Sequence, residues 1–98
     1  MESDSETKHV HVIVEGKVQA VGFRYFTWQT ARELKITGWV RNRDDGSVEI
    51  EAEGKTDAVN TFVNQIKKGS PFSKVRHVDV QVYKHSGNFS TFEIRDMY

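Results

Sequence analysis

One short stretch of the chain combines residue types that could bind an anion. It runs Gly16-Lys17-Val18-Gln19-Ala20-Val21-Gly22-Phe23-Arg24 and joins a valine-rich segment to an amphipathic one. Its two glycines and the small Ala20 allow the backbone to curl tightly, so that successive N–H groups can point at one position. Arg24 adds a guanidinium suited to bidentate contact with phosphate oxygens. The spacing alone predicts a phosphate- or carboxylate-binding loop and a plain strand-to-helix turn about equally.

Asn42 is the second candidate for chemistry, because it ends a predicted strand at a position that could lie beside this loop. An asparagine in a turn more often serves the backbone. Its amide cannot take up a proton near neutral pH, but it can hold a water molecule by donating and accepting hydrogen bonds. No Ser/His/Asp set is evident in the sequence, and no pair of carboxylates flanks the loop.

An arginine, backbone N–H groups and an asparagine allow only a restricted chemistry. They can bind a phosphoryl group, stabilise developing charge and place a water molecule in line. They cannot protonate a poor leaving group, so the substrate must already be activated. A mixed carboxylic–phosphoric anhydride meets this condition, because its carboxylate leaves without being protonated.

The pattern of apolar residues predicts the elements that would position this loop. Residues 9–15 alternate as a strand before it, with Val10, Val12 and Val14 on one face. A helix over about residues 23–34 follows, whose apolar stripe faces the core while Arg24 points toward the loop. The stripe consists of Phe23, Phe26, Thr30, Ala31 and Leu34.

The later elements complete the order β-α-β-β-α-β, with a short fifth strand added. Asp45-Gly46 indicates a hairpin between strands at residues 36–41 and 47–53. A second helix ends near Gly69, and strands follow at residues 75–83 and 91–95. Right-handed crossovers place both helices on one face of an antiparallel sheet, which predicts the α+β class and a ferredoxin-like α/β sandwich. The inward residues of the later strands are predicted to be Val48, Ile50, Ala52, Val78, Val80, Val82, Phe92 and Ile94.

Composition excludes several classes of function. The 98 residues suffice for one domain, and 14 basic against 14 acidic residues leave no net charge. This balance argues against nucleic acid as a partner and is compatible with the monomer that we expect. The absence of cysteine excludes disulfides, thiolate catalysis and Cys-ligated metals. No apolar run approaches ~18 residues, so we expect no membrane span.

The N-terminal residues differ in character from the rest. Residues 1–8 are polar and acidic and lack the apolar core of a signal peptide, so we expect a disordered tail. A single domain then occupies residues 9–98. From these features we expect the protein in the cytoplasm.

Two sets of ionisable residues invite a metal-site interpretation. His9 and His11 share one strand face and could ligate a metal, but no third ligand is evident, so a half-exposed strand face is favoured. Glu49, Glu51 and Glu53 lie along ~13 Å of another strand, which favours a solvated face over a cation site. We therefore expect no metal and no cofactor.

Two stretches resemble the signatures of the acylphosphatase family. Gly16-x-Val18-Gln19-x-Val21-x-Phe23-Arg24 resembles the first. Gly38-Trp39-Val40-Arg41-Asn42-x-x-x-Gly46-x-Val48, followed by Gly54, resembles the second. The resemblance extends over residues 9–95 in the same element order, and two linked signatures at the right separation are highly specific.

The resemblance implies hydrolysis of acyl phosphates to a carboxylate and inorganic phosphate, without metal or cofactor. It implies that Arg24 binds the phosphoryl group and that Asn42 orients the attacking water, whose proton passes to the substrate phosphate. The implied partners are a small acyl phosphate as substrate and inorganic phosphate as product and inhibitor. The implied phosphate-binding residues are Gly16, Val18, Gln19, Ala20, Val21, Gly22, Phe23 and Arg24.

The chain departs from the family at Ala20, where the family usually has glycine. If that position needs a positive φ, alanine costs about 1 kcal/mol or more, whereas at a negative φ it is harmless. An alternative function is therefore a phosphate- or anion-binding ferredoxin-like module with weak or no turnover. A third alternative, an RNA-binding ferredoxin-like domain, would need exposed aromatic residues on the central strands, where this sequence has glutamates.

Overall fold

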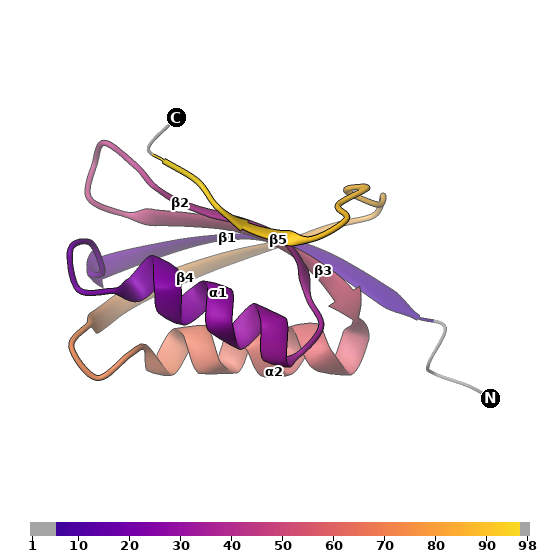
Figure 1. Ribbon diagram of the computed structural model, residues 1–98, viewed down its shortest axis with the longest axis horizontal. Coiled ribbons are helices and arrows are strands. Elements are labelled where there is room, and N and C mark those ends of the chain that lie inside the picture. The colour runs from indigo at the N-terminus through magenta and orange to yellow at the C-terminus, as the bar shows by residue number, and fades with distance from the viewer. Residues whose placement is uncertain (1–5, 97–98) are drawn as a thin grey trace.

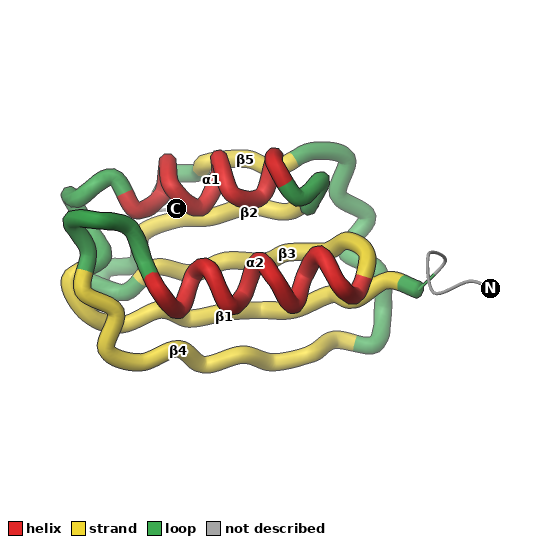
Figure 2. Tube along the Cα trace, turned by 90° about the horizontal axis from the view of Figure 1, so that it is seen from below, coloured by secondary structure: helices red, strands yellow, loops and turns green. Residues whose placement is uncertain are grey.

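The computed structural model describes residues 6–96 as two helices packed on one face of a five-stranded sheet (Figure 1). Figure 2 shows both helices lying across the same face. The strand order across the sheet is β4-β1-β3-β2-β5, which confirms the predicted ferredoxin-like sandwich. Neither helix in this part of the chain is long and apolar enough to cross a membrane. The elements are β1 (Thr7–Lys17), α1 (Phe23–Glu33), β2 (Thr37–Asn42), β3 (Val48–Lys55), α2 (Thr56–Lys68), β4 (Lys74–Tyr83) and β5 (Phe92–Ile94).

The sheet is mixed, because β5 pairs in parallel with β2 whereas the other pairings are antiparallel. The sequence predicted an antiparallel sheet, and the direction of β5 follows from its connection. β4 lies at one edge, and the chain turns at the end of β4 and returns along the opposite edge (Figure 2). A strand that returns in this way runs antiparallel to β4, and therefore parallel to β2.

β1 begins two residues earlier than the predicted domain boundary. Thr7 and Lys8, which we expected in the tail, pair with Lys55 and Gly54 of β3. Residues 1–5 of the expected tail lie outside the described residues.

The core lies between the helices and the inner face of the sheet. Val10, Val12 and Val14 of β1 are fully buried there, as the alternating pattern predicted. On α1 the buried stripe includes Thr27, while Phe26 is only partly buried. Thr27 is buried without an unsatisfied hydroxyl because its Oγ1 donates to the carbonyl of Phe23 at 2.9 Å.

Two predicted inward residues are exposed instead. Val82 of β4 is 59% exposed, and Ile94 of β5 is 43% exposed. Both lie on edge strands, which have a neighbouring strand on one side only. Phe92, on the same short strand as Ile94, is buried as predicted.

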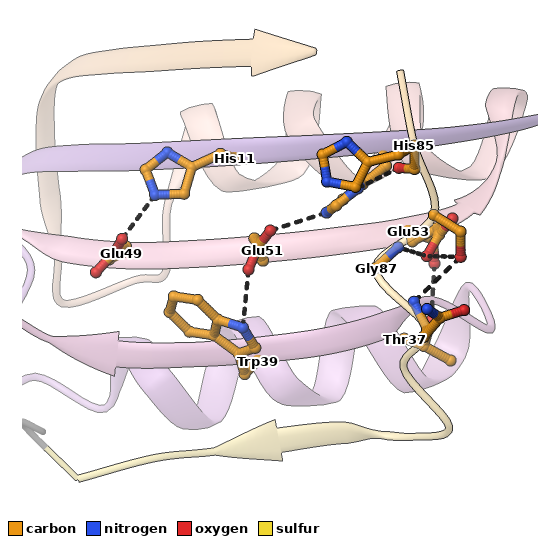
Figure 3. A network of polar contacts seen from close by, with 11 residues as sticks. His11, Thr37, Trp39, Glu49, Glu51, Glu53, His85 and Gly87 are labelled. Atoms are coloured by element: carbon orange, nitrogen blue, oxygen red, sulfur yellow. Dashed lines mark hydrogen bonds and ion pairs between the residues drawn. The ribbon is translucent and has the colours of Figure 1, made fainter. Parts of the chain in front are cut away.

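The sheet face away from the helices, here called the open face, carries a network of charged and polar side chains (Figure 3). His9 Nε2 lies 2.9 Å from a carboxylate oxygen of Glu51, and the indole N–H of Trp39 donates to the other oxygen at 3.1 Å. His9 is only 3% exposed rather than half exposed, because the segment after β4 folds back over it. Its Nδ1 donates to the carbonyl of His85 at 2.7 Å.

Glu49 occupies the next position along this network. His11 Nε2 lies 2.6 Å from one of its carboxylate oxygens, and Arg41 Nε donates to the other at 2.7 Å. Burial opposes ionisation of Glu49, but the contacts from His11 and Arg41 outweigh it and lower the pKa of this carboxyl below its ordinary value. The two histidines of β1 therefore contact carboxylates of β3, and no group of three potential metal ligands occurs in residues 6–96.

Candidate active site

β1 ends in a bulge that turns the chain away from the sheet. The pairing of β1 with β4 shifts register between Glu15 and Gly16. Gly16 has a φ of 130°, and a Cβ at this position would lie 2.1 Å from the carbonyl oxygen of Lys74. Only glycine fits such a close approach. The bulge therefore sets the direction of the following residues 18–22, which we call the cradle loop.

The cradle loop leads into α1 with a row of free backbone donors. Gly22 caps the helix in the left-handed conformation, with φ 76° and ψ 16°, and no side chain caps this end. The first bonded amide is that of Phe26, which donates to the carbonyl of Gly22 at 3.0 Å. Within residues 6–96, the amides of residues 19–25 have no hydrogen-bond partner. Free N–H groups at a helix N-terminus, together with the helix dipole, favour an anion.

A cleft of about 220 Å³ opens beside these donors. Arg24 is the only charged residue that lines it in the described part of the chain. The cleft brings Arg24 from the start of α1 together with Asn42 from the end of β2. Its lining residues are Val18, Ala20, Gly22, Phe23, Arg24, Tyr25, Asn42 and Ile94.

Arg24 is held by a contact that the sequence did not reveal. One guanidinium nitrogen, Nη1, donates to the backbone carbonyl of Arg95 at 2.9 Å. A guanidinium has five N–H donors in a fixed fork, so this bond restricts the side chain and leaves other donors for a ligand. The residue after β5 thus helps to position the charge at the cleft.

Asn42 contributes an unsatisfied acceptor. Its side-chain Oδ1 is buried and has no hydrogen-bond partner among the described residues. Leaving such a group unpaired costs about 1–3 kcal/mol, so an orphan acceptor in a cleft calls for a functional explanation. The Asn42 backbone is fixed by pairing with Val48 across the hairpin between β2 and β3.

Gln19 connects the cradle loop to that same hairpin. Its side-chain Nε2 donates to the carbonyls of Arg43 and Ser47, at 2.7 and 2.8 Å. The hairpin is itself braced by Asp45, whose carboxylate accepts from the hydroxyl and the amide of Ser47, and these bonds lower the pKa of Asp45. Gln19 therefore fixes the distance between the loop and the strand that carries Asn42.

The structure places three of the expected phosphate-binding residues outside the cleft lining. Gly16 lies at the β1 bulge, and Val21 packs against the hydrophobic core. The Gln19 side chain points to the hairpin. These residues shape the loop from behind, whereas Val18, Ala20, Gly22, Phe23 and Arg24 do line the cleft.

Ala20 has a φ of 60°, so this position does require the positive φ at which alanine is costly. This is the left-handed region, where a residue with a Cβ costs about 1–2 kcal/mol more than glycine. The loop thus has two left-handed residues, Ala20 and Gly22, on either side of Val21.

Two lining residues were not predicted as part of the site. Tyr25 follows Arg24 in the first turn of α1. Its position next to Arg24 was the only feature of the sequence that could have indicated that it lines the cleft. Ile94 comes from β5, far along the chain, and was predicted to face the core. No local pattern could have placed it here, because its position depends on how β5 pairs with β2.

The lining determines what chemistry the cleft can perform. It offers backbone N–H donors, one permanent positive charge and one free amide oxygen. No carboxylate or histidine lines it in the described residues. Such a site can bind and orient a phosphoryl group and a water molecule, but the described residues that line it include no carboxylate or imidazole to act as a general base.

A family model and several similar proteins name the same family. A family model described as Acylphosphatase matches residues 10–94. The chain is 54% identical over 83 residues to an acylphosphatase from Bacillus licheniformis, covering 85% of this chain and 92% of that protein. The crystal structure of an acylphosphatase from Bacillus subtilis matches with a TM-score of 0.88 at 46% identity, covering 90% of this chain and 98% of that one. An acylphosphatase structure from Coxiella burnetii matches with a TM-score of 0.86 at 35% identity, covering 91% and 93%.

Proposed function

This chain belongs to the acylphosphatase family, and we propose that it hydrolyses the carboxyl–phosphate bond of acyl phosphates to a carboxylate and inorganic phosphate. In this proposal the free amides of the cradle loop and of the first turn of α1 bind the phosphoryl group together with Arg24. Asn42 orients the attacking water. The observation that carries these roles is the buried, unpartnered Oδ1 of Asn42 in the same cleft as Arg24.

Binding of the phosphoryl group is the first step. The N–H groups of residues 19–25 have no partner among the described residues, so a phosphate gains their hydrogen bonds without breaking others. Arg24 adds charge-assisted bonds and balances the charge that develops on the phosphoryl oxygens. The positive end of the α1 dipole acts in the same direction.

Attack by water is the second step. The free Oδ1 of Asn42 accepts a hydrogen bond from the water and directs its lone pair toward phosphorus. A new P–O bond forms as the bond between phosphorus and the acyl oxygen breaks, and the electron pair leaves on the carboxylate. The proton of the water passes to a phosphoryl oxygen, so no protein base is required. Positioning of this kind is worth most in the transition state.

The wider setting of the reaction is also part of the proposal. We propose that the enzyme works as a monomer in the cytoplasm on small acyl phosphates, and that inorganic phosphate inhibits it as a product. The zero net charge is compatible with a monomer and gives no general attraction to nucleic acid.

Arg24→Ala tests this function. Steady-state hydrolysis of acetyl phosphate should lose about 10²–10³-fold in kcat/KM, since the substitution removes the one charged side chain that lines the cleft among residues 6–96. Arg24→Lys should recover only part of the rate, because the fork that donates to Arg95 is lost. A near wild-type kcat/KM in Arg24→Ala would refute the assignment.

The second candidate function is a phosphate- or anion-binding module with weak or no turnover. The φ of 60° at Ala20 is the observation that favours it. A strained loop would still bind an anion through its amides but would present them less often in the required arrangement. The protein would then bind inorganic phosphate while hydrolysing acetyl phosphate little faster than the uncatalysed reaction.

A further inference from the structure

His9 is a buried histidine that the proposed reaction does not use. It lies on the open face of the sheet, and its side chain is only 3% exposed. The segment that covers it joins β4 to β5 and comprises residues 84–91, here called the strap (Figure 3). Histidine is the side chain whose charge responds to pH near neutrality, so its contacts with a covering segment can depend on pH.

Both ring nitrogens of His9 face hydrogen-bond acceptors. Nδ1 lies 2.7 Å from the backbone carbonyl oxygen of His85 in the strap. Nε2 lies 2.9 Å from a carboxylate oxygen of Glu51 in β3. A neutral imidazole carries one N–H, so it can donate to only one of these acceptors. The observed arrangement therefore needs a second proton, held between Nε2 and the carboxylate.

His11, two residues along the same strand, needs no such proton. Its Nε2 lies 2.6 Å from a carboxylate oxygen of Glu49, and its Nδ1 has no hydrogen-bond partner among residues 6–96. Neutral His11 keeps this contact by carrying its single hydrogen on Nε2. Of the two histidines of β1, His9 is thus the one whose contacts require a doubly protonated ring or a shared proton.

Other titratable side chains also face His9. Glu53, opposite His9 on β3, accepts a hydrogen bond from the amide of Gly87 in the strap at 2.9 Å. Tyr83 of β4 places its ring 4.9 Å from that of His9, at an angle of 83°. The ring of His85 lies 5.5 Å away and is exposed. These groups surround the ring without bonding to its nitrogens, so the second proton depends on Glu51 and the His85 carbonyl.

Loss of the second proton forces a choice between the two contacts of His9. The remaining hydrogen is most stable on Nε2, because a bond to a carboxylate is charge-assisted and stronger than one to a neutral carbonyl. A hydrogen on Nδ1 would instead leave a lone pair facing the Glu51 carboxylate in a site almost closed to water. With the hydrogen on Nε2, Nδ1 presents a lone pair to the His85 carbonyl, and the contact with the strap is lost.

The contacts along the strap predict where it opens. The ring of Phe89 meets the edge of the His9 ring at 5.7 Å, close to the carbonyl that is released. At the far end, the carbonyl of Thr91 accepts from the amide of Gly38 at 2.9 Å, and this bond does not involve His9. Opening is therefore expected over residues 84–90, while β5 stays paired.

We propose that His9 and Glu51 form a proton-operated latch, which holds the strap over the open face while the pair shares a proton and releases residues 84–90 when that proton is lost. The protonated form makes both contacts, so the latch is closed at lower pH and opens as the pH rises. Neither residue lines the cleft, and the inference does not rest on the proposed function.

Protection of the Gly87 amide against hydrogen exchange reports the state of the strap. Its bond to Glu53 is broken whenever residues 84–90 open. With exchange rates divided by the intrinsic rate at each pH, wild-type protection should fall about fivefold to tenfold between about pH 5.5 and about pH 8.5, which spans the usual range for histidine. Protection of the Arg95 amide, which donates to Val40 at 2.8 Å, should not change.

Glu51→Gln and His9→Gln distinguish the latch from a general effect of pH. In Glu51→Gln the new amide can donate to an unprotonated Nε2 and still accept from Trp39, so Nδ1 keeps its hydrogen on the strap and protection should stay high throughout. His9→Gln has no titratable ring, so protection should be low and independent of pH. His77→Gln, at an exposed histidine of β4, is the matched control and should behave as wild type. Thermal unfolding checks that each variant is folded.

Nitrogen NMR of the His9 ring tests the choice of contact directly. Both ring nitrogens should carry a hydrogen at about pH 5.5, and only Nε2 at about pH 8.5. A hydrogen on Nδ1 alone at the higher pH, or equal wild-type protection of Gly87 at both pH values, would overturn the latch. A fall in protection that persists in Glu51→Gln would do the same, because it would assign the pH dependence to another group.

Discussion

Ala20 holds a backbone conformation that an alanine adopts only at a cost. Its φ of 60° places a Cβ in the left-handed region in the middle of the cradle loop, where the amides must converge on one phosphate. This conformation costs about 1–2 kcal/mol, and the cost falls on the loop whose amides bind the phosphoryl group.

Ala20→Gly should therefore raise kcat/KM on acetyl phosphate. Glycine adopts the same φ without strain, so the free loop spends more time in the arrangement that binds phosphate. Relief of about 1 kcal/mol corresponds to roughly a fivefold gain. Stability should change little, because glycine also increases the entropy of the unfolded chain. Steady-state kinetics with chemical denaturation of both proteins measures this. A level or lower kcat/KM would mean that loop strain does not limit the enzyme.

Asn42→Ala should separate catalysis from binding. Loss of the acceptor that holds the water should lower kcat by about 10²-fold, comparable with removal of other groups that act in the transition state. Inhibition by inorganic phosphate should scarcely change. The free energy of unfolding should hold or rise, because the substitution removes a buried oxygen that has no partner among the described residues. Parallel losses of rate, phosphate affinity and stability would instead assign Asn42 to the hairpin.

At the scale of elements, the site depends on how the cradle loop is joined to the β2–β3 hairpin. Gln19 makes this connection with a single amide nitrogen that donates to two carbonyls of the hairpin. The loop carries the phosphate donors and the hairpin carries Asn42, so their separation sets the distance between phosphate and water.

Gln19→Ala should lower stability and catalysis together. Loss of two hydrogen bonds to backbone carbonyls should cost about 2 kcal/mol of unfolding free energy. The kcat should fall about tenfold, since small displacements of the reacting groups are costly. Gln19→Glu should be worse, because a carboxylate cannot donate to either carbonyl. Gln29→Ala, at an exposed position of α1, is the control. A wild-type kcat in Gln19→Ala would show that the loop holds its position unaided.

The open face of the sheet makes a pH-dependent contribution to the stability of the fold. Contacts from His11 and Arg41 lower the pKa of Glu49 below its ordinary value of 4.5 despite partial burial. Since the folded-state pKa is the lower one, ionised Glu49 stabilises the fold above its unfolded pKa, and this stabilisation is lost as pH falls through the folded pKa.

Glu49→Gln should therefore lower the unfolding free energy by about 1–3 kcal/mol at neutral pH. The difference from wild type should shrink as pH falls below 4.5, where the unfolded wild-type chain begins to take up the proton, and it should be lost as pH falls through the lower folded-state pKa. Urea denaturation over a pH series measures this. Glu33→Gln, exposed on α1, should change stability by less than about 0.5 kcal/mol at every pH. A difference for Glu49 that does not vary with pH would assign its effect to packing.

At the scale of the whole molecule, binding of phosphate should stabilise the fold. The ligand contacts a loop that links the first strand and first helix, so it binds only the folded state. At about 100 times its dissociation constant, inorganic phosphate should add about 2.7 kcal/mol to the unfolding free energy. Thermal shift measurements should show this rise in wild type and its loss in Arg24→Ala. Chelators should change neither the shift nor turnover, and inactivation by EDTA that a divalent ion restores would contradict the proposed mechanism.

The sequence predicted the architecture because the core is built from strictly periodic residues. Val10, Val12 and Val14 alternate without interruption, and they are fully buried in β1. The same reasoning failed for Val82 and Ile94, whose alternation is equally regular. Periodicity says which face a residue shares, but burial on an edge strand depends on what covers that edge.

The candidate site was easiest to predict where its residues are close in the sequence. The cradle loop and Arg24 form one continuous stretch, so their types and spacing indicated anion binding. Asn42 was a candidate because the strand that it ends could lie beside the loop, and in the structure it lines the same cleft. The two hydrogen bonds from Gln19 to the hairpin and the hydrogen bond from Arg24 to Arg95 join segments that are distant in the sequence. All three are accepted by backbone carbonyls, which every residue has. Residue type therefore gave no sign of them.

β5 follows every other strand in the described chain, and the residue after it supplies the carbonyl that holds Arg24. A ribosome makes the chain from its N-terminus, so the cradle loop, α1 and the hairpin leave the exit tunnel before residues 92–95 do. Until those residues emerge, Arg24 lacks its acceptor and the cleft lacks the wall that Ile94 provides. A nascent chain that has formed most of the sheet but not yet exposed residues 92–95 should therefore be inactive.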